Sequence, residues 1–359
     1  MGIDQMNGIR AGARIAVGSL PQADAQSAVR VQCQAFPEVP AWPQMPKRTI
    51  RERITLQGLS GLPGLHFKQD GTATWKPPPG GWNILSMKLV EARKSGELNS
   101  AALTPDDAAG FFAFLKEGPS FFKPELQAVK GQCVGPVTLG MALRSPEGKP
   151  CLRDQEAMEA LVEYLTNHAL WQARTLSTLG KPVVMFLDEP SRGGWDPVEM
   201  GLDPRTVRGW YDRILGPLQE EGVLTGLHAC GKGPFAWALR SCVEIFHFDG
   251  HRFLDPLLGE SGDLAAFLGQ GGWLSFGMVP TAMSHGVFPE AAGLVDRWMR
   301  FAHELSRRGV PSGTLAAQSA FSTSCGLGGG SLAVAEEASR CLAGFTALWN
   351  INSKIGFPE

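Results

Sequence analysis

One histidine and two cysteines are placed in the sequence where they could bind a metal ion together. His228 and Cys230 are separated by one residue at the end of an apolar run, so an extended chain points both side chains to the same side. Cys325 follows a later apolar run, in a glycine-rich turn. Two sulfur ligands and one imidazole nitrogen suit Zn²⁺. The alternative for the His-x-Cys pair, which often occurs by chance, is a packed cysteine beside a hydrogen-bonded histidine.

A carboxylate could complete this set of ligands. The run at 243–249 ends at Asp249, which shares one side of an extended segment with His247, whereas Glu244 points to the other side. We therefore predict that Asp249 is a fourth, displaceable oxygen ligand of the metal. Its alternative roles are to cap a helix or to form an ion pair.

Two further pairs of residues indicate a bound substrate. Asp188 and Glu189 directly follow five apolar residues, where adjacent acids are unfavourable in a buried strand unless they bind a partner. We expect them to meet a ligand or its amine, and the alternative is that they cap the next helix. Nearer the N-terminus, Gly18 and Ser19 offer backbone N–H groups and a hydroxyl, which suit a carboxylate.

The elements that carry these residues are short β-rich runs that alternate with amphipathic helical stretches. Such an alternation predicts a parallel sheet, in which the polar residues at the carboxyl ends of the strands form one site. Two early candidate strands lie at 14–19 and 37–43. The six later runs are 126–133, 183–188, 223–228, 243–249, 273–279 and 315–321. Eight strands in an α/β chain predict a closed (β/α)8 barrel of the TIM type.

Neither a linker nor a repeat divides the sequence, so we predict a single catalytic barrel domain over residues 1–359. Residues 58–82 contain an Asp-Gly turn between short β-like runs and then a cluster of prolines and glycines, which predicts a hairpin excursion on the barrel rim. The competing architecture is a doubly wound open sheet. It is disfavoured because the turn after the first strand lacks the G-x-G-x-x-G pattern of a dinucleotide site.

The composition excludes several classes of partner. The chain has 359 residues, with 33 Lys and Arg against 35 Asp and Glu, and no basic cluster. We therefore expect no binding to nucleic acid or to an anionic membrane. No run is long and apolar enough for a membrane helix, and the N-terminus lacks the pattern of a signal peptide. We predict a cytoplasmic protein whose seven cysteines are reduced thiols.

Five motifs in this order resemble those of the catalytic barrel of cobalamin-independent methionine synthase, in its single-barrel form. The broader group also holds uroporphyrinogen decarboxylase and the corrinoid-dependent thiol methyltransferases. The motifs are VGSLPQ at 17–22, VKGQCVGPVT at 129–138, FLDEP at 186–190, LHACG at 227–231 and STSCGLGG at 322–329. Each motif falls at the predicted end of a strand or at the turn that follows it, where a barrel enzyme places its chemistry.

The resemblance implies that the three metal ligands described above bind zinc, with Asp249 where the family has a glutamate. It also implies that Gly18, Ser19 and Asp188 contact homocysteine, whose zinc-bound thiolate attacks the methyl group of a folate. Zinc lowers the pKa of a thiol, so a nucleophilic thiolate exists near neutral pH.

The chain departs from the family at two positions that would touch the reactants. Gln44 aligns with an acidic residue that faces the substrate ammonium, so we assign Gln44 to the substrate site with one negative charge fewer. Val279 aligns with a histidine that helps to protonate the folate leaving nitrogen. His285 is the nearest replacement, and we predict it as a catalytic residue together with Asp188. A methylcorrinoid expels reduced cobalt and needs no such proton.

We predict a zinc-dependent methyltransferase that activates a small thiol, homocysteine or a similar compound. The methyl donor is a methylcorrinoid, either free methylcobalamin or a corrinoid protein partner, or methyltetrahydrofolate, and we expect the corrinoid to react faster. An apolar surface for the corrinoid ring could come from the loop residues Trp42, Met45, Trp195, Met278 and Met283. The alternatives are a uroporphyrinogen decarboxylase-like enzyme, for which an arginine-rich N-terminal motif is missing, and a non-catalytic zinc- or corrinoid-handling protein.

Overall fold

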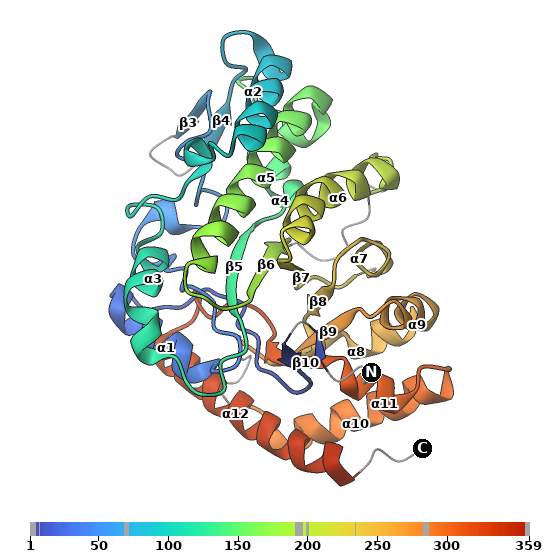
Figure 1. The fold of residues 1–359 in the computed structure, drawn as a ribbon. Coiled ribbons are helices and arrows are strands. Elements are labelled where there is room, and N and C mark those ends of the chain that lie inside the picture. Colours follow the sequence, from blue (N-terminus) through green and yellow to red (C-terminus); the bar gives the residue numbers. More distant parts are fainter. Residues whose placement is uncertain are drawn as a thin grey trace.

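The computed structural model describes residues 5–6, 8–67, 72–190, 197–198, 201–233, 235–282 and 287–355. At its centre lies a parallel sheet of six strands in the order β10-β9-β8-β7-β6-β5, so strands that follow one another along the chain are neighbours. The strands are β5 (Val129–Val134), β6 (Val183–Asp188), β7 (Leu224–Ala229), β8 (Ile245–Phe248), β9 (Trp273–Val279) and β10 (Ser319–Thr323). Helices connect them and lie around the outside of the sheet (Figure 1). The predicted α/β class and parallel sheet are therefore confirmed.

The helices after β5 are α4 (Pro136–Ala142), α5 (Gln155–Ser177), α6 (Pro204–Glu220), α7 (Ala236–Leu239), α8 (Gly250–Leu258), α9 (Ser261–Gly269), α10 (Ala291–Arg307), α11 (Ser312–Ala317) and α12 (Leu332–Ile355). Before the sheet come the short antiparallel pair β1 (Gln5–Met6) and β2 (Ile9–Arg10), then α1 (Ala25–Ala35), α2 (Gly81–Ser95) and α3 (Ala109–Phe121). Single 3₁₀ turns lie at Ile50–Glu52, Asn99–Ala101 and Cys151–Arg153. In the part of the chain that the structure describes, none of the helices combines the length and apolar character of a membrane span.

Aspartate side chains set the first residue of several helices. Asp24, Asp154, Asp203 and Asp249 each accept a backbone N–H from the first turn of the helix that follows. Such a bond pairs one of the N–H groups that a helix start leaves without an intrahelical partner. The cap at Asp249 matters below, because Asp249 is also a predicted metal ligand.

Two predicted strands differ from the structure at their ends. The predicted strand at 315–321 is wrong at its start, since residues 312–317 form α11 and β10 begins at Ser319. Leu315 and Ala316 are buried in a helix, and a short apolar run cannot by its pattern alone be assigned to helix or strand. β8 ends at Phe248, one residue before Asp249.

The two predicted N-terminal strands, at 14–19 and 37–43, do not form regular strands. Isolated parallel bridges join the first segment to β10, through Arg14 and Phe321, and the second segment to β5, through Ala41 and Lys130. Two further bridges, Ile15 with Val39 and Ser19 with Gln44, join the two N-terminal stretches to each other. The second segment contains Pro37, Pro40 and Pro43, which lack the N–H that a ladder requires. The described residues thus form a six-stranded sheet with bridged segments at both edges, and not the predicted continuous sheet of eight.

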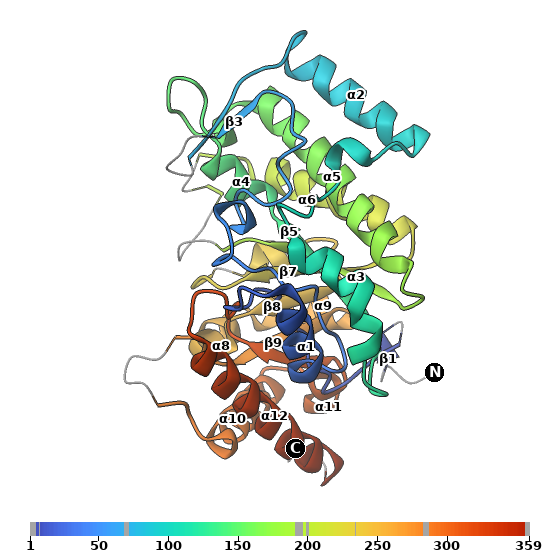
Figure 2. The ribbon, with the colours of Figure 1, turned by 90° about the vertical axis from the view of Figure 1, so that its left-hand side faces the viewer.

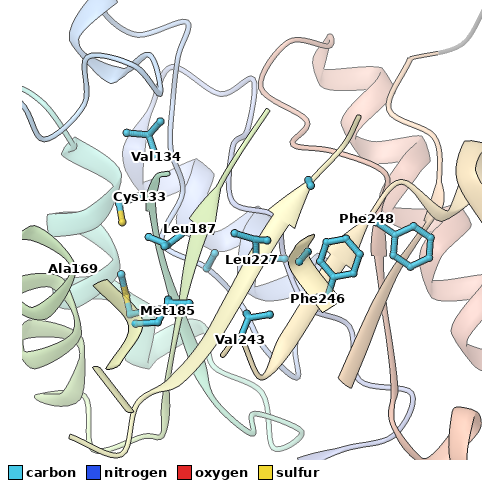
Figure 3. Close-up of a cluster of buried hydrophobic side chains, with 14 of the residues drawn as sticks. Cys133, Val134, Ala169, Met185, Leu187, Leu227, Val243, Phe246 and Phe248 are labelled. Carbon is cyan, nitrogen blue, oxygen red and sulfur yellow. The ribbon is translucent and has the colours of Figure 1, made fainter. Parts of the chain in front are cut away.

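Two buried clusters pack on the two faces of this sheet, because successive side chains of a strand point to opposite faces. The larger cluster packs the strands against the helices, and Figure 3 shows Met185, Leu187 and Leu227 within it. The smaller cluster lies on what we call the inner face, and it includes Val184, Leu224, Ile245, Trp273 and Ala320 together with Ile15 and Val39. Toward the carboxyl ends of the strands the inner face becomes polar, and the predicted site residues lie there.

The segment from β3 to the 3₁₀ turn at Asn99–Ala101 forms an excursion at one end of the molecule, where α2 and β3 lie far from the C-terminus, whereas α1 lies near α12 (Figure 2). Within it, β3 (Leu65–Phe67) and β4 (Ala73–Trp75) form an antiparallel hairpin inside the range 58–82. A buried chain of hydrogen bonds holds the excursion to α5, and we call this chain the rim network. Trp42 Nε1 donates to Gln172 Oε1 at 3.0 Å, Gln172 Nε2 donates to His168 Nε2 at 2.8 Å, and His168 Nδ1 donates to the carbonyl of Ala101 at 2.7 Å.

Candidate metal centre

The carboxyl ends of β7 and β10 bring the three predicted metal ligands together. His228 lies in β7, Cys230 follows the last residue of β7, and Cys325 lies two residues after β10. One ligand atom from each lies within 4.8 Å of the others, and Cys325 Sγ is 3.8 Å from His228 Nε2. His228 is buried, whereas both cysteines are half-buried. The strands thus hold the ligands firmly while the two sulfur atoms stay within reach of a small molecule.

The two thiols differ in protonation. A hydrogen bond from Cys230 holds the pKa of Cys325 well below its usual range, against burial and with help from His228. The same bond, together with burial, raises the pKa of Cys230. Burial lowers the pKa of His228, but the hydrogen bond and charge of Cys325 outweigh burial, so the net pKa is raised. These interactions favour the thiolate form of Cys325, which is the form of cysteine that binds a metal.

This donor set fits Zn²⁺. Thiolate sulfur and imidazole nitrogen are the ligands that zinc prefers, and three protein ligands leave a fourth position for a substrate, as in catalytic zinc sites. Among the described residues, no other group of three His, Cys, Asp or Glu side chains converges in this way. The geometry thus supports a single metal centre at the carboxyl edge of the sheet.

Asp188, His228 and His247 form a polar row on the inner face, because they are paired in register across β6, β7 and β8. His228 Nδ1 lies 2.5 Å from His247 Nδ1. Burial lowers the pKa of His247 well below its ordinary value, and the charges of His228 and Lys130 act in the same direction, so His247 is neutral. The sequence reasoning gave His247 no role, although a histidine within a short apolar strand was a signal.

Asp249 does not belong to the group of side chains that converge within 4.8 Å, and its carboxylate is engaged elsewhere. It is buried, Oδ1 accepts the N–H of Arg252 at 3.0 Å at the start of α8, and Arg252 Nε lies 3.8 Å from Oδ2. Burial raises the pKa of Asp249 to about 6, against the hydrogen bond and charge of Arg252. The structure thus shows the helix cap that was the alternative role, and ligation by Asp249 stays a prediction that requires its carboxylate to turn.

Asp188 ends β6 beside His228 and lines a small cavity of about 10 Å³, roughly the space that one water molecule needs. The residue is only 5% exposed, and its Oδ1 has no hydrogen-bond partner among the described residues. Burial raises the pKa of Asp188, while the charges of Lys130 and His228 lower it. Because an unpaired buried oxygen is costly, a ligand that donates a hydrogen bond to Asp188 would be bound favourably.

Glu189, the neighbour of Asp188, has a different environment. Its carboxylate accepts the N–H groups of Val137 and Thr138 at 3.0 and 2.8 Å, the Tyr211 hydroxyl at 2.8 Å, and the Thr138 hydroxyl. These bonds hold the first turn of α4 and use the available lone pairs of the carboxylate. The expectation that Glu189 meets a ligand is therefore wrong, and so is the alternative that it caps the next helix, because the helix start that it holds is that of α4, which precedes it in the chain.

Gly18 and Ser19 lie beside the turn that carries Cys325. Gly18 has a φ of +134°, and a Cβ atom there would lie 2.8 Å from the Gln132 side chain, so glycine is required. Ser19 Oγ accepts the N–H of Gly328 at 3.2 Å, and the Ser19 carbonyl accepts that of Leu327 at 2.9 Å. Ser19 thus supports the glycine-rich turn, and its hydroxyl proton can still serve a substrate carboxylate.

The predicted substrate residue Gln44 lies next to this pair. Its backbone N–H donates to the carbonyl of Gly18 at 3.1 Å, and its side chain lines the cavity at Asp188. The cavity is therefore bounded by two of the predicted substrate residues, Gln44 and Asp188, while Ser19 lies on the bridged segment beside them.

Lys130 is a further residue to which the sequence reasoning gave no role. It is fully buried, and Nζ donates to the Val17 carbonyl at 2.8 Å and to Gln132 Oε1 at 3.3 Å. Burial lowers the pKa of Lys130 to about 8, although the charge of Asp188 raises it. The signal was a lysine and a glutamine that alternate within the apolar strand VKGQCV. Lys130 places a positive charge beneath the site, which favours the ionised form of Asp188.

The prediction of an open apolar surface for a corrinoid ring is wrong for three of the five residues that we assigned to it. Trp42, Met45 and Met278 are fully buried and pack in the larger cluster, because large apolar side chains at strand ends fill the core. Trp195 and Met283 lie outside the described residues, and so does the predicted catalytic residue His285. Val279 is fully buried, as its apolar side chain favours.

Comparison with solved structures gives two informative matches. A B12-independent methionine synthase from Shewanella sp. W3-18-1, in complex with selenomethionine, is 17% identical, with a TM-score of 0.48 over 64% of this chain and 64% of that one. A protein from Listeria monocytogenes with the provisional name of vitamin-B12-independent methionine synthase is 12% identical, with a TM-score of 0.50 over 90% of this chain and 87% of that one. No family model and no curated protein sequence matches the chain.

At these identities the matches concern the fold, and the Listeria structure covers nearly the whole chain. The chain therefore shares its fold with the Listeria structure, whose name is that of the family that the motifs of this chain resemble.

Proposed function

We propose that the protein is a zinc-dependent thiol methyltransferase of the methionine synthase type. The observation that carries this proposal is the convergence of His228, Cys230 and Cys325 at the edge of the sheet where Asp188 has an oxygen without a partner among the described residues. The fold shared with structures of that name supports it. We also infer that the bridged segments at the sheet edges complete a TIM-type barrel, in which this site occupies the usual position at the carboxyl ends of the strands.

His228, Cys230 and Cys325 would hold the zinc ion. When bound, zinc lowers the pKa of a coordinated substrate thiol and so supplies a nucleophilic thiolate near neutral pH. Asp249 would take the fourth position in the absence of substrate and return to the N–H of Arg252 when a thiol enters. The half-buried sulfur atoms leave the approach to that position open.

The acceptor that these residues suit is an amino-acid thiol such as homocysteine. Asp188 would accept hydrogen bonds from the ammonium group, and the buried charge of Lys130 favours the ionised carboxylate that this requires. Ser19 would donate its hydroxyl proton to the substrate carboxylate while its oxygen keeps the bond from Gly328. Gln44 is neutral, so Asp188 alone would balance the ammonium charge in the cavity.

The methyl donor would be methyltetrahydrofolate or a methylcorrinoid, the latter free or on a partner protein. Val279 supplies no proton for a folate amine. The buried positions of Trp42, Met45 and Met278 remove the apolar surface that favoured a corrinoid. The described residues thus favour neither donor, and the two must be compared directly.

The test combines metal analysis with a methyl-transfer assay. Purified protein should contain about one zinc ion per chain, as a three-ligand catalytic site binds one. It should convert homocysteine to methionine with at least one of methyltetrahydrofolate and methylcobalamin, and only while zinc is bound. X-ray absorption at the zinc edge should show one additional sulfur ligand when homocysteine is added. Protein that binds zinc but neither gains this ligand nor transfers a methyl group would be a non-catalytic zinc protein, and protein without metal would overturn the proposal.

A further inference from the structure

A pair of buried imidazoles links the candidate metal site to the interior of the sheet. His228 in β7 and His247 in β8 are opposite each other in register, and their Nδ1 atoms are 2.5 Å apart. The other nitrogen of His247, Nε2, lies 3.1 Å from the backbone carbonyl of Thr323 in β10. Ring planes inclined at 51° show that the rings meet through these nitrogens and are not stacked.

The carbonyl of Thr323 determines where the protons of this chain lie. A carbonyl oxygen only accepts hydrogen bonds, so Nε2 of His247 must carry a proton. In a neutral imidazole the other nitrogen is then an acceptor, so Nδ1 of His247 receives the proton that Nδ1 of His228 donates. Nε2 of His228, which faces Cys325 Sγ, is then the nitrogen whose lone pair a metal ion can take in place of a proton.

We propose that His247 is a positioning residue, which fixes the tautomer and ring orientation of His228 so that His228 Nε2 binds the metal. Metal-binding histidines commonly donate their second N–H to an acceptor in this way, and the acceptor here is another histidine. The inference rests on the zinc site of the proposed function, and it adds a residue that touches neither metal nor substrate.

The same chain of contacts also reaches the second element that carries a ligand. Thr323 accepts from His247 through its carbonyl, and its hydroxyl donates to the carbonyl of Cys325 at 2.8 Å. The hydrogen bonds therefore run from His228 through His247 and Thr323 to the backbone of Cys325. His247 thus couples the position of the imidazole ligand in β7 to that of the turn after β10.

The test compares zinc affinity in variants that keep different parts of this chain. His247→Leu removes both contacts and should weaken zinc binding about 10- to 100-fold in competition with a chelator, as loss of such a partner does elsewhere. His247→Asn keeps an acceptor near His228 Nδ1 and should bind zinc within about threefold of wild type. Cobalt(II) in place of zinc should show a changed absorption spectrum in the Leu variant and a nearly native one in the Asn variant.

Ser275→Ala is the matched control. Ser275 pairs in register with His247 on the next strand and is equally buried, but its hydroxyl has no hydrogen-bond partner among the described residues. This variant should bind zinc like wild type.

Two further outcomes separate this inference from the proposed function. Wild-type affinity in a folded His247→Leu protein would overturn the positioning role while leaving the zinc site intact. If that variant does not fold, His247→Gln takes its place, because its longer side chain reaches Thr323 but offers no acceptor at the position of Nδ1. Equal zinc affinity in the Asn and Gln variants would then overturn the role. Wild-type protein that binds no zinc refutes the proposed function instead.

Discussion

Two buried polar regions of this protein differ in whether their hydrogen bonds are complete. In the rim network, Trp42 donates a hydrogen bond to Gln172, Gln172 donates one to His168, and His168 donates one to the carbonyl of Ala101. At the carboxyl edge of the sheet, Asp188 has an oxygen without a partner among the described residues, and the hydrogen bond from Cys230 lowers the pKa of the half-buried Cys325. Complete pairing stabilises a fold, whereas unpaired buried groups cost stability and are typical of sites that a ligand completes.

The same contrast separates two adjacent residues. Glu189 accepts hydrogen bonds from α4 and from Tyr211, whereas Asp188 Oδ1 accepts none among the described residues. Both carboxyls are buried, and burial raises the pKa of each, so burial alone does not distinguish them. The number of hydrogen-bond partners does distinguish them: it gives Glu189 a structural role, and it is the reason why we propose that Asp188 binds a ligand.

The largest effect on zinc binding is expected when a predicted metal ligand at the carboxyl edge of the sheet is removed. Since loss of an outer contact already weakens metal sites about 10- to 100-fold, Cys325→Ser should weaken zinc binding beyond that range and leave little zinc in the purified protein. Cys242→Ser is the control, because Cys242 is also half-buried but lies outside the group of three ligands. Zinc analysis after extensive dialysis measures the difference, and full occupancy in Cys325→Ser would contradict the assignment.

The next effect concerns the two adjacent acids. Asp188→Asn removes the charge that faces the cavity and should weaken homocysteine binding roughly 10- to 100-fold, as charge-assisted bonds of about 1.5–3 kcal/mol imply. Zinc content and thermal stability should stay close to wild type. Glu189→Gln should show the reverse, a lower melting temperature with unchanged affinity, because an amide NH₂ would face the N–H groups of α4. Calorimetric titration and thermal unfolding of both variants check this, and the same pattern in both would remove the distinction.

A smaller effect, on stability alone, is expected from a change in the rim network. Gln172→Leu leaves the Trp42 N–H and the His168 ring without their partners, which should lower the free energy of unfolding by about 2 kcal/mol. Zinc affinity should not change, since none of these residues belongs to the metal group. Urea denaturation and zinc competition on the same samples measure both quantities. A loss of zinc affinity without a loss of stability would show that the rim network serves the site.

Residue type and spacing were enough to predict that His228, Cys230 and Cys325 converge, because they follow apolar runs whose ends are local features of the sequence. The partner of each polar group was not predictable in the same way. Asp249 caps α8 and Glu189 holds α4 because of backbone groups that only the folded chain places beside them. The burial of Trp42 and the helix at Leu315 likewise depend on tertiary packing, which an apolar pattern does not specify.

The smallest effect is expected from Lys130. Like the rim network it has hydrogen-bond partners, but like the candidate metal centre it has a buried group that is costly, in this case its charge. Burial lowers its pKa from 10.5 to about 8. Between pH 8 and pH 10.5 the unfolded chain therefore binds more protons than the folded chain, so the free energy of unfolding rises with pH in this range. Below about pH 8 Lys130 is charged in both states, and its burial destabilises the fold most. From pH 7 to 9 the free energy of unfolding of wild type should rise by about 1 kcal/mol relative to that of Lys130→Met. Urea denaturation of both proteins in matched buffers measures the difference. Parallel pH profiles would show that the charge of Lys130 costs nothing and would place this residue with the fully paired, structural groups.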